Sequence, residues 1–103
     1  MIVQIVKVRS GLPDTDVHTT IDERAPQFRA LPGLLQKYYT RDRETGEYAG
    51  IYIWDGEESL REFRESDLAR TIPAAYRVQG QPHVAILDVI SVLRAEEGES
   101  PRL

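Results

Sequence analysis

The segments 31-LPGLLQKYY-39 and 48-YAGIYIW-54 decide the fold of this chain. The pair Pro32-Gly33 predicts the end of a helix, and the residues that follow it in the first segment are largely of the types that favour strands. The polar connection between the segments contains Gly46, which can supply the positive φ of a hairpin turn. The two segments are therefore expected to form neighbouring antiparallel strands.

Both strands carry large apolar or aromatic side chains at odd and at even positions. Side chains alternate between the two faces of a strand, so the sheet that contains these strands has two apolar faces. Each apolar face needs a cover. The rest of the chain offers only two helix-like segments, which are enough for one face. We expect a second copy of the chain to cover the other.

The first helix is predicted over residues 14–31. Its apolar positions recur at steps of three and four, which is the spacing of one helix face. Asp14 or Thr15 can cap its start. Pro26 lies inside the pattern and removes one backbone donor, so we expect the helix to kink or split near Asp22.

The second helix is predicted to begin at Asp55. This residue and Glu58 have the spacing of a capping box, and the apolar positions that follow extend to Leu68. One further helical turn is expected within 72–78. Residues 83–93 are mostly apolar and predict a final strand.

The expected order of elements is strand, helix, strand, strand, helix, strand. The strands are expected at residues 2–8, 34–40, 48–54 and 83–93. This order is that of a ferredoxin-like βαββαβ domain, an α+β fold in which right-handed crossovers place both helices on one face of a four-stranded antiparallel sheet. This arrangement predicts a homodimer joined through the uncovered sheet faces. It also predicts a cavity between the sheet and the helices in each subunit.

Composition limits the classes of partner. The chain has 103 residues, for which we expect one domain over 1–94 and a polar, mobile tail over 95–103. Its net charge of −4 and its scattered basic residues do not favour nucleic acid. The absence of cysteine excludes disulfides and thiolate chemistry. The start of the chain has neither a basic leader nor a long apolar run, so we expect a cytoplasmic protein without a membrane partner.

The chain resembles the dimeric α+β barrel family of antibiotic-biosynthesis monooxygenases, and within it the small mono-oxygenase branch. The resemblance lies in residues 28–34, 37–39 and 48–54, which run on into 57–60. Members of this architecture include cofactor-independent oxygenases of polycyclic phenols, haem-degrading enzymes and stress-related proteins. The resemblance marks the fold more than the reaction.

The residues argue against a bound cofactor or metal. Haem-degrading relatives carry an iron-ligating His on the second helix, and the segment 57–67 has none. The chain also lacks the motifs of nucleotide binding, phosphoryl transfer and Ser-centred hydrolysis. His18 and Asp22 have helical spacing, but two ligands do not make a metal site. We expect no cofactor and no metal.

The expected substrate-binding wall lies on the second central strand. Gly50, Tyr52 and Trp54 share one face of this strand, and the resemblance implies that a Trp at this strand end lines the substrate cavity. The Tyr and Trp rings beside a glycine would form a flat slot for an aromatic ring. The alternative is that the rings simply pack in the core. Tyr38 and Tyr76 are further candidates for binding substrate.

The opposite face of the same strand is expected to meet the partner subunit. Its residues are Ala49, Ile51 and Ile53. Tyr38 and Tyr39 point to opposite faces of their own strand, so only one of them can reach the cavity.

Three residues are candidates for the proton acceptor that a cofactor-free oxygenase needs. Imidazole is the side chain most often used for such proton transfer, which makes His18 and His83 two of the candidates, and Tyr52 is the third. For each histidine the alternative is a solvent-facing residue at the end of an element. Lys37 stands in an otherwise apolar strand, where it can meet an anion or extend its amine from a sheet edge to water.

The sequence thus predicts a cofactor-independent monooxygenase that acts on a small aromatic or quinol-like substrate. The alternative from a different class is a non-catalytic dimer that binds a small molecule or serves a stress response. A third reading is an accessory subunit whose cavity is filled by its own side chains.

Overall fold

The computed structural model describes residues 1–94, so the tail expected over 95–103 lies outside the described residues. The elements are β1 (Ile2–Ser10), α1 (Asp14–Arg29), β2 (Leu34–Arg41), β3 (Tyr48–Trp54), α2 (Glu57–Arg64), α3 (Asp67–Arg70), α4 (Ile72–Ala75) and β4 (Val78–Asp88).

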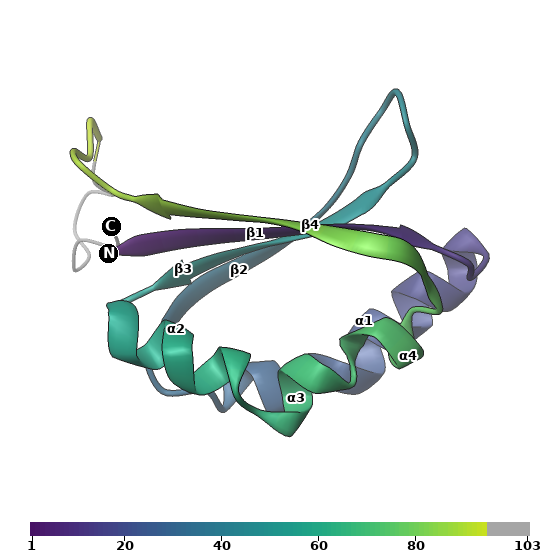
Figure 1. The fold of residues 1–103 in the computed structure, drawn as a ribbon, viewed down its shortest axis with the longest axis horizontal. Coiled ribbons are helices and arrows are strands. Elements are labelled where there is room, and N and C mark those ends of the chain that lie inside the picture. The colour runs from purple at the N-terminus through teal and green to yellow at the C-terminus, as the bar shows by residue number, and fades with distance from the viewer. Residues whose placement is uncertain (95–103) are drawn as a thin grey trace.

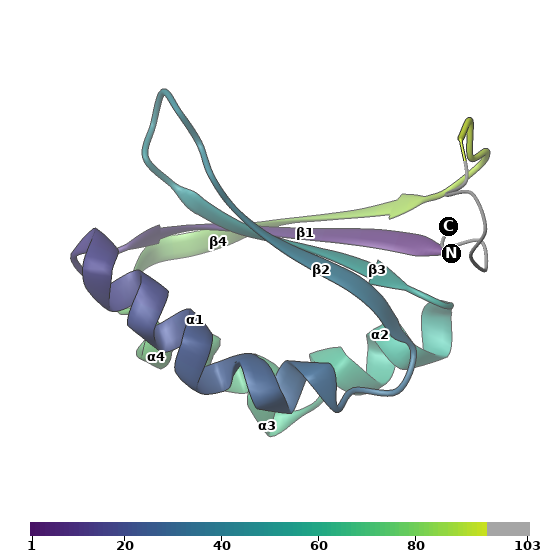
Figure 2. The ribbon, with the colours of Figure 1, turned by 180° about the vertical axis from the view of Figure 1, so that it is seen from behind.

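The four strands form one antiparallel sheet in the order β2-β3-β1-β4. All the helices lie on one side of this sheet, which leaves its other face open (Figures 1 and 2). The hairpin that joins β2 to β3 projects away from the helices (Figure 1). These observations confirm the ferredoxin-like α+β fold that the order of the sequence segments predicts.

The strand register decides which side chains face the helices. Tyr52 on β3 lies opposite Gln4 on β1 and Lys37 on β2. Residues that are paired across antiparallel strands project from the same face, so these three side chains all face the helices. One position along, Ile51 lies opposite Ile5 and is therefore on the open face.

An aromatic cluster occupies the space between the sheet and helix α2. Tyr52 and Trp54 are stacked with their ring centroids 5.9 Å apart, and the ring of Phe63 lies 5.2 Å from each of them. Trp54 is only 1% exposed, and its indole N–H donates a hydrogen bond of 3.0 Å to the buried Gln4 side chain. The pairing satisfies the indole donor and the Gln4 oxygen away from water.

Helix α1 differs from its prediction in two details. It runs without interruption from Asp14 to Arg29, so the expected split near Asp22 is wrong. Pro26 falls in the last turn, so it removes one bond, to the carbonyl of Asp22, and the helix ends three residues later. The N-cap is Pro13 and no side chain caps the helix. The Asp14 carboxylate instead accepts a hydrogen bond from the hydroxyl of Tyr48.

The second helical region is also divided differently. The N-cap of α2 is Gly56 and no side chain caps it, so the expected capping box at Asp55 does not form. The chain then turns at Ser66, whose hydroxyl accepts a hydrogen bond from the N–H of Ala69 and caps α3. Two short helices therefore follow α2 where the sequence predicts one longer helix and a turn.

The last strand begins and ends five residues earlier than predicted, at Val78 and Asp88. Gly80 adopts a φ of 72°, and the register with β1 shifts at this point, which makes an irregularity in the strand. Pro82 is tolerated because β4 is an edge strand. Gly80 and Pro82, which favour a chain break in the sequence, therefore lie within a bulged edge strand.

Candidate functional site

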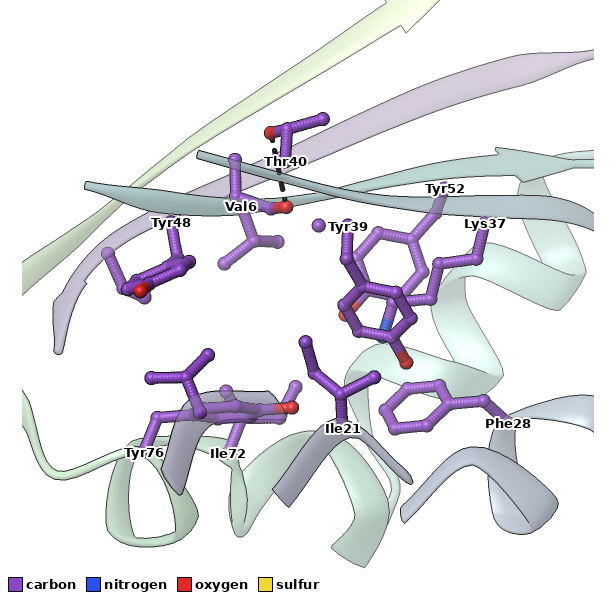
Figure 3. Close-up of a pocket in the computed structure, with 14 residues that line it drawn as sticks. Val6, Ile21, Phe28, Lys37, Tyr39, Thr40, Tyr48, Tyr52, Ile72 and Tyr76 are labelled. Atoms are coloured by element: carbon purple, nitrogen blue, oxygen red, sulfur yellow. Dashed lines mark hydrogen bonds between the residues drawn. The ribbon is translucent and has the colours of Figure 1, made fainter. Parts of the chain in front are cut away.

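A cavity lies between the sheet, helix α1 and the chain around α4 (Figure 3). Its enclosed volume is about 50 Å³, and it has an open mouth. Apolar and aromatic side chains make up most of its lining. The helix side is formed by Val17, Ile21, Phe28, Ile72 and Tyr76, and the sheet side includes Val6, Val8, Lys37, Tyr39, Gly50 and Tyr52.

The amine of Lys37 is surrounded by aromatic rings at one end of this cavity. Its Nζ atom lies 3.4 Å from the centroid of the Phe28 ring and 4.4 Å from the centroids of the Tyr39 and Tyr52 rings. Figure 3 shows the side chain reaching from β2 to these rings. Within residues 1–94 the amine forms no ion pair with a carboxylate.

Two effects act on the protonation of this amine in opposite directions. Burial lowers the pKa of Lys37 to about 7, and the positive charge of Arg24 adds to this effect. The faces of the surrounding rings attract the ammonium form and oppose the decrease. An amine whose pKa lies near neutrality can both accept and donate a proton at physiological pH.

The tyrosine hydroxyls of the cavity remain protonated near pH 7. Burial raises the pKa of Tyr39 and of Tyr52, and it raises the pKa of Tyr76 to about 12. These groups therefore act as neutral hydrogen-bond donors or acceptors rather than as bases near pH 7. For the expected role of Tyr52 as proton acceptor, this protonation state is unfavourable.

Gly50 allows the Lys37 and Tyr52 side chains to come together. A Cβ atom at this position would lie 3.0 Å from the Tyr52 ring and 3.4 Å from Cε of Lys37. Both distances are at or below ordinary van der Waals contact, so any larger residue would push these groups apart. Gly50 therefore contributes to the cavity by leaving room for these two side chains. The sequence predicts a different role for it, beside a flat slot in which an aromatic ring would stack.

The structure brings some of the predicted binding residues to the cavity and leaves others outside. Gly50, Tyr52 and Tyr76 line it. Trp54 is sealed beneath Tyr52 in the core and is not part of the lining. Tyr38 is paired with Ile51 on the open face, where it is 54% exposed, so Tyr39 is the member of this pair that reaches the cavity.

Neither histidine lies at the cavity. His18 follows the buried cavity residue Val17 and is itself exposed, because one step along a helix turns the side chain to another face. His83 lies within β4 rather than at its start, is paired with Lys7, and is exposed. Their roles as proton acceptors stay predictions to which the position of the cavity gives no support.

Sequence reasoning missed Tyr39 and Phe28 as cavity residues and gave Lys37 only a secondary role. The signal that identifies the two β2 residues is the cross-strand pairing of Lys37 with Tyr52 and of Tyr39 with Gly50. This pairing depends on a register irregularity between Leu34 and Gln36, which the sequence does not reveal.

Two features of other kinds of protein are absent from the described part of the chain. Residues 1–94 contain no group of three or more His, Cys, Asp or Glu side chains arranged to hold a metal ion. In the same part of the chain, no helix has both the length and the apolar character needed to cross a membrane.

Solved structures with the same fold cover most of this chain. A "putative antibiotic biosynthesis monooxygenase" from Deinococcus radiodurans has a TM-score of 0.72 and 13% identity, covering 93% of this chain and 99% of that chain. A protein of the same description from Caulobacter crescentus has a TM-score of 0.73 and 19% identity, over 87% and 90% of the two chains.

A third similar structure is SnoaB from Streptomyces nogalater, described as a cofactor-independent oxygenase. It has a TM-score of 0.71 and 14% identity, and the match covers 89% of this chain and 95% of SnoaB. At these identities the likeness extends to the fold alone. No curated protein matches the chain.

A family model gives the closer relationship. The model described as "Putative mono-oxygenase ydhR" matches residues 2–89, which include every strand and helix that the structure describes. The match agrees with the resemblance carried by residues 28–34, 37–39 and 48–54. The chain belongs to the ydhR mono-oxygenase family.

Proposed function

We propose that this protein is a cofactor-independent monooxygenase that acts on a small aromatic or quinol-like substrate. The observation that carries the proposal is the aromatic cavity with one amine inside it and no carboxylate in its lining. Such a cavity suits a flat, electron-rich molecule with a hydroxyl that can meet the amine. Membership of a mono-oxygenase family supports the proposal.

The proposed reaction consumes one molecule of oxygen and needs no bound redox group. A phenol loses its proton, and the phenolate gives one electron to O₂, which produces an aryloxyl radical and superoxide. The pair combines at a ring carbon that still carries a hydrogen, and protonation of the peroxide gives a hydroperoxide. Loss of water leaves a carbonyl. One oxygen atom enters the product, and the phenolic and ring hydrogens leave with the other as water.

The substrate ring can enter only if a side chain moves. The enclosed volume of about 50 Å³ is well below the roughly 150 Å³ of an apolar cavity that binds benzene. Tyr39 is the best candidate for this movement because it is 38% exposed, whereas Tyr52 is 2% exposed. Displacement of Tyr39 would enlarge the cavity and free one side of the Lys37 amine.

Oxygen uptake tests this function directly. The protein is mixed with anthrone-type phenols and hydroquinones in an oxygen electrode, and we expect uptake well above the rate in buffer for at least one of them. With ¹⁸O₂, mass spectrometry should find one labelled atom in each product molecule. Saturable binding under nitrogen without uptake in air would instead favour a non-catalytic binding or stress-response dimer. No binding of any aromatic compound would favour the accessory-subunit reading.

We also propose that the protein is a homodimer joined through the open faces of its sheets. The helices cover only one face of the sheet (Figure 1). The open face carries Tyr38 and Leu87 at 54% and 49% exposure beside the apolar residues Ile5 and Ile51. A contiguous apolar surface of this kind is typical of an interface rather than of a monomer exposed to water.

The dimer is tested by a charge on its proposed interface. Leu87→Glu should produce a monomer in light scattering at micromolar concentration, with a dissociation constant raised on the order of 100-fold or more, because an unpaired charge would be buried on association. Val84→Glu is the matched control: it lies on the same strand with a similar exposure of 52%, but faces the other side. A wild-type protein that is already monomeric would contradict the proposal.

A further inference from the structure

We propose that Lys37 accepts the phenolic proton, so that the cavity holds its substrate as a phenolate paired with the Lys37 ammonium group. The inference rests on the proposed function, because it names the base of that reaction and the ionisation state of its substrate. It assigns to a lysine the step for which the sequence suggested a histidine or a tyrosine.

The composition of the cavity lining leads to this assignment. The lining contains no histidine and no carboxylate, and its titratable side chains are Lys37 and four tyrosines. The tyrosines are poor bases near neutrality, because the oxygen of a neutral phenol binds a proton far more weakly than an amine does. Lys37 is the one nitrogen base among the lining residues, and its amine already lies beside the rings between which a substrate would insert.

The charges around the cavity favour an anion in it. Arg24 on α1 lies against the same ring as the lysine, with its guanidinium carbon 5.9 Å from the Phe28 centroid. It donates hydrogen bonds to the carbonyl of Leu68 at 2.9 Å and to the hydroxyl of Thr71 at 3.2 Å, and its Nε is buried without a partner. Arg24, like Lys37, has no carboxylate partner within residues 1–94.

The other titratable groups that face Lys37 do not change this balance. Tyr39 on the same strand and Tyr52 on β3 lie against the amine, Arg24 on α1 acts on its charge, and Tyr76 after α4 lines the same cavity. The tyrosines are neutral near pH 7 and the arginine is positive. The site therefore has an excess of positive charge once the lysine is protonated, which an anionic substrate would neutralise.

The proton transfer is balanced within the cavity. The phenol loses H⁺ to the neutral amine, which gives a phenolate and an ammonium ion with no net uptake or release. After oxygen has combined with the ring, the ammonium can return the same proton to the peroxide anion. The lysine thus acts first as base and then as acid, and it is ready for the next turnover.

This arrangement selects a class of substrate. The transfer is most favourable for phenols that are as acidic as the Lys37 ammonium or more so, which are phenols with electron-withdrawing or extended aromatic substituents. Simple alkyl phenols hold their proton more tightly and should bind weakly. The preferred substrates are therefore acidic phenols and the enol forms of polycyclic ketones.

Binding of 4-nitrophenol tests the inference without any need for turnover. Its phenolate is yellow and its neutral form is not. At pH 6 the free compound is mostly neutral, and we expect saturable growth of the phenolate band when wild-type protein is added. Lys37→Met should abolish the band and weaken binding roughly 10- to 100-fold, as expected for a lost charge-assisted hydrogen bond.

Two further variants separate the role of the proton from that of the charge. Lys37→Arg keeps the positive charge but cannot accept a proton. At pH 8, where free 4-nitrophenol is mostly phenolate and the Lys37 amine is mostly neutral, the wild type should take up close to one proton from solvent for each phenolate bound, whereas Lys37→Arg should take up none. Lys7→Met is the control for the other lysine of the chain, which lies on the open face in ion pairs with Asp42 and Glu47. It should leave the phenolate band unchanged.

The outcomes distinguish this inference from the proposed function. A phenolate band that persists in Lys37→Met would overturn it, as would binding of the neutral form or no binding by the wild type. A protein that gives a Lys37-dependent band but consumes no oxygen with any oxidisable phenol would retain the inference as a binding property and reject the monooxygenase. Oxygen uptake that survives in Lys37→Met would do the reverse.

Discussion

Lys37→Met is expected to make the protein more stable at pH 7 and at the same time inactive. A pKa lowered from 10.5 to about 7 means that the folded state disfavours the ammonium form by about 4–5 kcal/mol at and below neutral pH. Methionine fills a similar volume without this cost. Because the rings around the amine recover part of it, we expect a gain of about 2–4 kcal/mol in the free energy of unfolding.

The pH dependence of stability gives a sharper test of the same variant. Between about pH 7 and pH 10 the unfolded chain keeps the Lys37 proton that the folded chain has lost, so the unfolded state binds more protons and wild-type stability rises with pH. Above pH 10 the sign reverses, because the cavity tyrosines stay protonated in the folded state and ionise in the unfolded one. The variant should lose the rise and keep the fall.

The measurement is urea unfolding followed by the fluorescence of the single tryptophan at several pH values. Oxygen uptake by the same variant should fall by roughly 10²- to 10⁴-fold, which is the usual contribution of a general base. Lys37→Arg is the control, because it keeps the buried charge and should gain no stability. Equal stability of wild type and Lys37→Met at pH 7 and pH 10 would show that the amine is not desolvated.

The fold could be predicted from the sequence because its signals are local. The glycine and proline before Leu34, the hairpin around Gly46 and the spacing of apolar residues each specify one element, and the order of elements then leaves few topologies. The details that failed depend on neighbours in space. Pro26 was expected to split α1, but it falls in the last turn, and the bulge at Gly80 lets β4 start before Pro82.

The site could be predicted only in part, because it depends on which face of each strand the helices cover. For β3, alternation placed Gly50 and Tyr52 together, and they do line the cavity. For β2, the choice between Tyr38 and Tyr39 depends on a register that only the assembled sheet reveals. The importance of Lys37 follows from its burial among three rings from different elements. No local pattern in the sequence indicates this burial.

Trp54 is the residue for which the resemblance and the structure give different expectations. The resemblance implies that it lines the substrate cavity. The structure places it 1% exposed beneath Tyr52, outside the lining and bonded to Gln4. Trp54→Ala is therefore expected to lower the free energy of unfolding by about 3–5 kcal/mol, which is the cost of emptying a large core site. This substitution measures stability only.

Trp54→Phe separates the two expectations, because it keeps most of the core volume and removes the indole N–H. It should cost about 1–3 kcal/mol, largely because the buried oxygen of Gln4 loses its partner. Adding Gln4→Leu should recover part of that loss in a double-mutant cycle. Oxygen uptake at a temperature where the variant is folded should stay within a few-fold of wild type. A severe loss of oxygen uptake in a folded Trp54→Phe protein would instead indicate that the indole contacts the substrate. In the structure, this buried ring can affect the cavity only by holding Tyr52 in position.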